Sequence, residues 1–155
     1  MIENAIKFPR QLDQNYETPQ RDPVLDCYLQ IEESYGYLRK KYPTDPRILK
    51  EQAKNWQLIG LYQQKKFNFD DALLYHARAF ERFSYLKNYT AANVSAVSAA
   101  RIFESQRNNS KAAAWYKRVL DFSLQKPNGL SDQFSEIAFA ALSSLHPTVK
   151  STLKQ

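Results

Sequence analysis

Apolar residues recur along most of the chain at intervals of three and four, the spacing of helices that bury one face. No segment shows the period of two that marks a half-buried strand. Helix start signals begin with the pairs Asp22-Pro23 and Asp45-Pro46, in which Asp can cap a helix and Pro suits its first position. We expect six helices: 23–41; 46–66; a third capped by Asn68; a fourth capped by Thr90 and ending near Gln106; a fifth starting at Asn109 or Ser110 and ending at Lys126-Pro127-Asn128-Gly129; and a sixth capped by Ser131 and ending before Pro147.

These helices predict an all-α domain over residues 23–146. Residues 1–22 contain Pro9 and Pro19 among many polar side chains, which predicts an irregular N-terminal segment, and residues 147–155 are expected to be a C-terminal tail. The chain has only three glycines, fewer than an α/β enzyme with phosphate-binding loops or an all-β sandwich normally needs for its turns. Its 155 residues suffice for one domain with its own core.

Two series of residues recur with a period of about 40, which predicts alternating types of helix. The first series has a small residue after a residue that we expect to be buried: Ile59-Gly60, Ala99-Ala100 and Phe139-Ala140. The second has a ring four positions after a smaller residue: Ile31 and Tyr35, Ala72 and His76, Ala112 and Tyr116. We therefore expect Gly60, Ala100 and Ala140 to lie where two helix backbones approach closely.

The first of these units resembles the tetratricopeptide-repeat (TPR) signature. It reads Trp56-x2-Ile59-Gly60 and then, 16 residues after Trp56, Ala72-x3-His76. A second unit reads Ala96-x2-Ala99-Ala100-x2-Phe103 and then Ala112-x3-Tyr116, with the same 16-residue spacing. The resemblance covers about residues 53–125. Residues 24–43 are similar to the second helix of an earlier repeat, and residues 131–145 to the first helix of a later one.

The chain also departs from that family in ways that bear on the prediction. Its period is 40 residues, against about 34 in the family. Gln63 stands at the position of a tyrosine, His76 replaces an aromatic residue and Ala96 replaces the tryptophan. The resemblance is therefore to a TPR-like stack with longer helices or loops, and other helical repeats with periods near 40 stay open.

The resemblance implies a right-handed stack of antiparallel helix hairpins, a TPR-like α-solenoid of about six helices. In that family the first helix of each repeat lines a groove that holds a peptide or helix of another protein. The implied function is a protein-binding scaffold or adaptor, working alone or as a subunit of a larger complex, without catalysis. The groove residues implied by position are Lys54, Gln57, Leu61, Gln64, Lys65, Val94, Val97, Arg101, Glu104, Ser105, Phe134, Ile137, Ala141, Ser144 and Leu145.

Two other readings of these surfaces stay open. The apolar residues of the N-terminal segment, Ile2, Ile6, Phe8, Leu12 and Tyr16, could fill the groove from within the same chain. The chain also has a formal net charge of +6, which suits an acidic protein or a nucleic acid. Basic residues gather near the first predicted loop with Tyr42 among them, as in a surface that holds phosphates and stacks a base: Arg39, Lys40, Lys41, Arg47, Lys50 and Lys54.

Candidate catalytic chemistry is sparse. His76 lies in the apolar series with Leu73 and Phe80, so we expect a core ring, not a catalytic base. Cys27 is the single cysteine and is expected to be a small buried hydrophobe, which leaves no disulfide framework. No phosphate-binding loop, dinucleotide fingerprint, nucleophile elbow or HExxH zinc motif occurs, so we expect neither enzyme activity nor a cofactor or metal. The sequence shows no membrane span and no secretory signal, which favours an intracellular, cytoplasmic protein.

Overall fold

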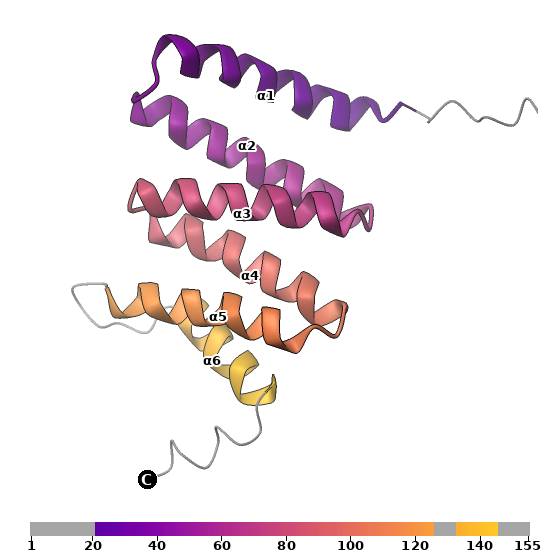
Figure 1. Cartoon of the computed structure of the whole chain (residues 1–155), viewed down its shortest axis with the longest axis vertical. Coiled ribbons are helices and arrows are strands. Elements are labelled where there is room, and N and C mark those ends of the chain that lie inside the picture. Colours follow the sequence, from indigo (N-terminus) through magenta and orange to yellow (C-terminus); the bar gives the residue numbers. More distant parts are fainter. Residues whose placement is uncertain (1–20, 126–132, 146–155) are drawn as a thin grey trace, which may run out of the picture.

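A computed structural model of the chain describes residues 21–125 and 133–145, which form six α-helices and no strand (Figure 1). The all-α prediction is therefore confirmed over these residues. The helices are α1 (Pro23–Lys41), α2 (Pro46–Lys65), α3 (Phe69–Tyr85), α4 (Tyr89–Ser105), α5 (Asn109–Leu124) and α6 (Gln133–Leu145). The expected N-terminal segment, the Ser131 cap and the C-terminal tail lie outside the described residues.

The predicted caps are confirmed for α1 and α2; the α3 prediction is right in position but not in capping bond, and the α4 prediction is wrong. Asp22 accepts hydrogen bonds from the backbone N–H groups of Val24 and Leu25, and Asp45 accepts one from Arg47. Asn68 occupies the N-cap of α3, but its amide donates to Gln63 Oε1 instead of capping the helix. The Thr90 prediction is wrong, because α4 begins at Tyr89 and Asn88 accepts the capping bond from Ala91 N.

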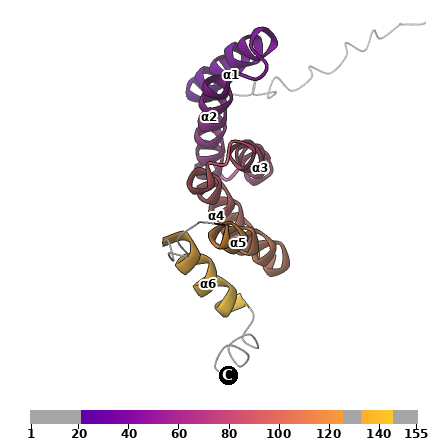
Figure 2. The same cartoon turned by 90° about the vertical axis from the view of Figure 1, so that its left-hand side faces the viewer.

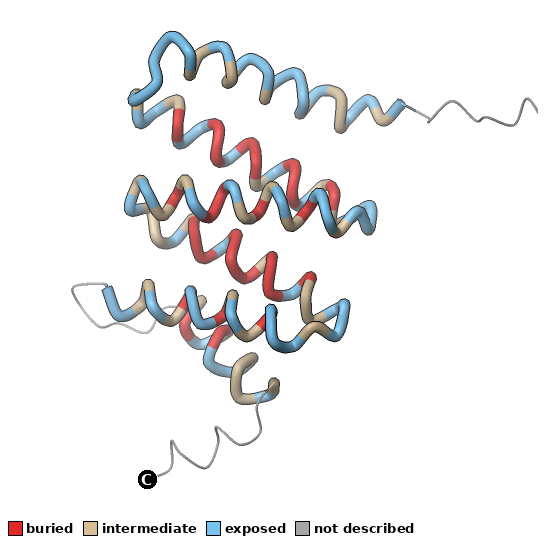
Figure 3. Tube along the Cα trace, viewed as in Figure 1, coloured by how far each residue is buried: buried red, intermediate tan, exposed pale blue. Residues whose placement is uncertain are grey.

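The helices form two layers, and each helix packs on the next along the chain. Helices α2, α4 and α6 make one layer and α1, α3 and α5 the other (Figures 1 and 2). Within the first layer the backbones of α2 and α4, and of α4 and α6, approach each other, whereas α3 and α5 of the second layer meet mainly through long side chains such as Phe80 and Trp115. The buried residues of α2 and α4 form continuous lines between the layers (Figure 3). The first layer is thus the more closely spaced side of the stack.

Three interhelix turns share one backbone geometry and follow one another at equal intervals along the chain. Phe67, Lys87 and Arg107 have φ angles of 61°, 55° and 57°, the left-handed region that non-glycine residues seldom adopt. In each turn this residue's N–H donates to the carbonyl three positions back, and the next N–H, from an asparagine, donates to the carbonyl five positions back. This is the Schellman arrangement, which ends a helix by satisfying two of its free carbonyls. Each turn thus ends one helix and places an asparagine at the cap of the next.

The regular spacing stops after α5. Helices α3, α4 and α5 begin at equal intervals, at Phe69, Tyr89 and Asn109, whereas the interval before α6 is longer. The residues between α5 and α6 lie outside the described part of the chain. Among the described residues, the regular series of helix starts therefore covers α3, α4 and α5 and does not include α6.

The prediction of a close crossing at Ala140 is wrong, and so is the prediction that Phe139 is buried. Phe139 is 50% exposed and Ala140 is exposed. Their counterparts in α2 and α4 are buried between each helix and the one that follows it, but no described helix follows α6 to cover them.

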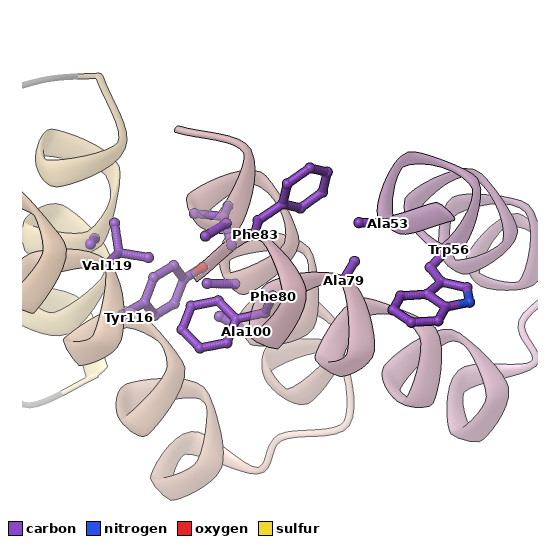
Figure 4. Packing of buried hydrophobic residues seen from close by; sticks show 12 residues of the cluster. Ala53, Trp56, Ala79, Phe80, Phe83, Ala100, Tyr116 and Val119 are labelled. Carbon is purple, nitrogen blue, oxygen red and sulfur yellow. The ribbon is translucent and has the colours of Figure 1, made fainter. Parts of the chain in front are cut away.

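Gly60 and Ala100 fit the predicted close packing. A Cβ atom added to Gly60 would lie 2.8 Å from Cε1 and 2.9 Å from Nδ1 of the buried His76 ring, so the α2–α3 crossing leaves no room for a methyl group. Ala100 and Tyr116 lie 40 positions after Gly60 and His76, respectively. Both are buried in the main core, where Figure 4 shows them beside Phe80. The Phe80 ring also lies edge-on to Trp115, with ring centroids 5.3 Å apart, which joins α3 to α5.

None of the residues of helix α1 is buried, and polar contacts help to hold it on α2. Gln52 Nε2 donates to Glu32 Oε1 at 2.8 Å, and Tyr62 donates to Asp22 Oδ2 at 2.6 Å. The expected burial of Cys27 is wrong, since its side chain is exposed. Ile31 is exposed too, unlike the fully buried Ala72 and Ala112 with which the repeat had aligned it.

Replacing Lys87 by glycine should stabilise the protein, because glycine adopts a positive φ without the strain of a Cβ atom. We expect a gain of about 0.5–1 kcal/mol, or a rise in melting temperature of about 1–4 °C. Thermal unfolding followed by circular dichroism measures it. Lys87→Val is the matched variant and should lower the melting temperature; a glycine variant no more stable than the valine one would contradict the turn geometry.

Gly60→Ala should destabilise the protein by about 1–3 kcal/mol, because the new methyl group overlaps the His76 ring. The added cost should largely disappear in the background His76→Ala, where the space is free. Urea unfolding of the wild type, both single variants and the double variant gives this coupling energy. Additive effects would show that the two residues do not share the crossing.

Candidate protein-binding surface

An exposed strip runs along α2 and α4 on the face opposite to their buried residues. We call this the α2–α4 strip; it comprises Lys50, Lys54, Leu58, Leu61 and Lys65 of α2 and Val94 and Arg101 of α4. The α2 members are three or four residues apart, so they share one side of the helix. Leu58, Leu61 and Val94 are 48%, 41% and 37% exposed. The strip therefore presents apolar side chains to solvent between basic ones.

Gln57 joins the two helices that carry the strip. Its Nε2 donates to the Ala91 carbonyl at 2.8 Å and to Ser95 Oγ at 2.7 Å. Ser95 is fully buried, so this amide satisfies a hydroxyl that would otherwise lack a partner between the layers. Gln57 was expected to contact a ligand, but its amide instead holds α2 and α4 side by side.

The other residues implied for the groove divide into exposed and half-buried sets. Five are exposed and lie on or beside the strip, which leaves them accessible to a partner: Lys54, Leu61, Lys65, Arg101 and Ser105, with Val94 at the boundary. Gln64 is half-buried, and its Oε1 lies 3.4 Å from His76 Nε2. Glu104 is half-buried next to Tyr116, whose pKa is raised by burial and by this carboxylate.

The expectation that Val97 lines an open groove is wrong. Val97 is 4% exposed and belongs to the main core, against which Phe134, Ile137 and Ala141 of α6 pack. Leu145 packs against the same core, while Ser144 is exposed. Helix α6 thus packs against the core the apolar residues that, in a regular repeat, would line the groove. This removes the third helix from the predicted groove and leaves the surface on α2 and α4.

Leu58 is a member of the strip that the sequence reading missed. It lies four residues after Lys54 and three before Leu61, both of which were identified. The helical spacing of exposed positions in α2 would have found it, whereas transfer of positions from the TPR family did not.

The strip carries more basic than acidic charge. Lys54 pairs with Glu51, with Nζ and Oε1 2.8 Å apart. Among the described residues, Lys50 and Lys65 form no ion pair, whereas Arg101 on α4 interacts with the Tyr116 hydroxyl. Lys50 and Lys65 lie towards the two ends of α2, and Leu58 and Leu61 lie between them.

The basic cluster near the α1–α2 loop is partly neutralised. The Arg47 guanidinium donates to both carboxylate oxygens of Asp45, at 3.2 and 2.9 Å. Arg39 is half-buried and close enough to Arg82 to contribute, after burial, to lowering the pKa of Arg82. Lys40, Lys41 and Lys50 are exposed and form no ion pair within the described part of the chain, although Lys41 Nζ lies 5.5 Å from the centroid of the Tyr42 ring.

The main cavities of the described residues are not lined by members of the α2–α4 strip. One of about 530 Å³ is lined by Tyr35, Leu38, Tyr42, Asp45, Arg47, Ile48 and Glu51 at the α1–α2 loop. Another of about 480 Å³ lies beside the turn that contains Phe67. Within residues 21–125 and 133–145, no cluster of three or more His, Cys, Asp or Glu side chains is placed to hold a metal ion. None of the described helices is both long and apolar enough to cross a membrane.

Comparison with known proteins found no match for this chain among family models, curated proteins or solved structures.

The expectation that His76 is a core residue is confirmed. The side chain is buried, its Nδ1 has no hydrogen-bond partner, and burial lowers its pKa from 6.5 to about 4. The sequence had given a catalytic base as the alternative role for this histidine. In the structure the ring fills the space above Gly60.

Acidification should weaken the fold through His76. Between pH 6.5 and about 4 the unfolded chain takes up a proton that the folded ring does not, so the free energy of unfolding falls as the pH falls. The slope from this one group approaches about 1.4 kcal/mol per pH unit. Urea unfolding at several pH values in this window, on the wild type and on His76→Gln, isolates the effect. Equal pH dependence in the two proteins would rule out a buried neutral histidine.

Proposed function

We propose that this protein is a TPR-like scaffold or adaptor that binds a segment of another protein along the α2–α4 strip. The proposal rests on the two-layer stack, in which α2 and α4 correspond to the groove-lining helices of the family that the sequence resembles. The binding surface is smaller than the sequence implied, because α6 packs its apolar side onto the core.

One observation carries this proposal: three apolar side chains, Leu58, Leu61 and Val94, are exposed on neighbouring helices where the fold does not need them. The core is complete without them, since none belongs to the buried cluster or to the residues packed against it. Apolar residues grouped within a polar rim are typical of a surface that another protein covers. The residues proposed to contact the partner are Lys50, Lys54, Leu58, Leu61, Lys65, Val94 and Arg101.

A matched pair of substitutions tests this function. Leu61→Asp should remove partner binding, because it places a charge within the apolar part of the strip. Leu74→Asp, at an equally exposed leucine on α3 in the other layer, should leave binding unchanged. Both should change stability by no more than about 0.5 kcal/mol, as exposed sites usually do.

A photo-crosslinking residue at position 58 supplies the readout in an extract of the cells that express the protein. We expect a specific crosslinked product that disappears in the Leu61→Asp background and persists with Leu74→Asp. Loss of the product in both backgrounds, or in neither, would contradict the assignment of the strip. A product that is destroyed by nuclease would instead support the rival function, nucleic-acid binding.

A further inference from the structure

We propose that the partner segment is an amphipathic α-helix with acidic residues near both ends and apolar residues between them. This inference rests on the proposed function, since it describes what the α2–α4 strip would bind.

Charge complementarity selects an acidic partner. The α2–α4 strip contains three lysines of α2 and Arg101 of α4 but no acidic residue, and only Lys54 is paired with a neighbouring carboxylate, that of Glu51. On α3, in the other layer, two basic residues stand against three acidic ones. The strip is therefore the more basic of these two exposed faces. Opposite charges at the rim of an interface favour the encounter and fix its register, whereas a basic partner would be repelled.

The order of side chains along α2 sets the order expected in the partner. Lys54 and Lys65 flank Leu58 and Leu61 on this helix. The two lysines are about three helical turns apart, a separation of about 16 Å along the axis. A bound helix lying along α2 would meet them with acidic groups that are also about three turns apart. An extended strand would span the same distance with about five residues.

The shape of the strip favours a helical partner over an extended peptide. None of the main cavities in the described part of the chain is lined by Leu58, Leu61 or Val94, which favours a shallow surface across two adjacent helices. A helix can lay one apolar side on such a band, with anchors three or four residues apart. An extended peptide normally gains its affinity from a sheet edge or from deep side-chain pockets, which this face does not offer.

Three labelled synthetic peptides, each long enough for about four helical turns, test the proposal with the full-length protein. The first has leucines along one helical side at its centre and pairs of glutamates centred about three turns apart. The second replaces each glutamate by lysine. The third keeps the composition of the first but brings the glutamates to about five residues apart, the spacing that suits an extended strand. Fluorescence anisotropy measures each affinity, and circular dichroism reports helix formation on binding.

We expect the first peptide to bind at least tenfold more tightly than the other two and to become helical. The variant Lys54→Glu/Lys65→Glu should weaken its binding at least tenfold and should strengthen binding of the lysine peptide. The matched control is Lys87→Glu/Lys117→Glu, which reverses two exposed charges away from the strip and should bind like the wild type.

The outcomes separate this inference from the proposed function. Equal binding of the glutamate and lysine peptides, lost in Leu61→Asp, would overturn the acidic partner and leave the strip as a protein-binding surface. Preference for the third peptide would overturn the helical form. Absence of binding by all three, together with no crosslinked protein at position 58, would overturn both proposals. A random single-stranded oligonucleotide that binds more tightly than the first peptide, and is lost with the Lys54/Lys65 variant, would overturn the acidic helix in favour of nucleic acid.

Discussion

The positive φ angle at one residue in each of three turns is the constraint on which the arrangement of the helices depends. Phe67, Lys87 and Arg107 accept this conformation although none is a glycine, because the two hydrogen bonds that each turn makes satisfy the end of the preceding helix. Each turn then starts the next helix at a fixed position, so that helices of similar length return alongside one another. The repeated turn is what brings Gly60 against His76 and Ala100 into the core with Tyr116.

Two consequences of this arrangement define the candidate surface. The buried sides of α2 and α4 face the second layer, which leaves their opposite sides, with Leu58, Leu61 and Val94, directed to solvent. Gln57 then ties α2 to α4 through Ala91 and Ser95 and makes one continuous strip from two helices. The strip ends at α4, because α6 packs its apolar side against the core. The binding proposals thus follow from backbone geometry as well as from side-chain character.

Local signals predicted the helices well, since Asp-Pro pairs, asparagines and apolar spacing act within a few residues. The same spacing identified Gly60 and Ala100, and the ring of His76, as core positions. The regular series of Schellman turns was missed because a positive φ at Phe67, Lys87 or Arg107 has no signature in the residue type; glycine would have given one. Burial of Val97 and exposure of Phe139 depend on the orientation of α6, which a carried-over repeat could not supply. The prediction that Cys27 is buried was wrong for a related reason, because α1 packs mainly on α2 and has no buried residue.

Methyl resonances offer the most direct measurement of the central claim, that a partner helix lies on the α2–α4 strip. Leucine and valine methyl groups of the full-length protein would be labelled and titrated with the glutamate-bearing helical peptide. The account predicts that the signals of Leu58, Leu61 and Val94 shift together and saturate, while those of Leu74 on α3 and Val119 in the core stay in place. Shifts confined to Leu74, or spread evenly over both layers, would contradict it.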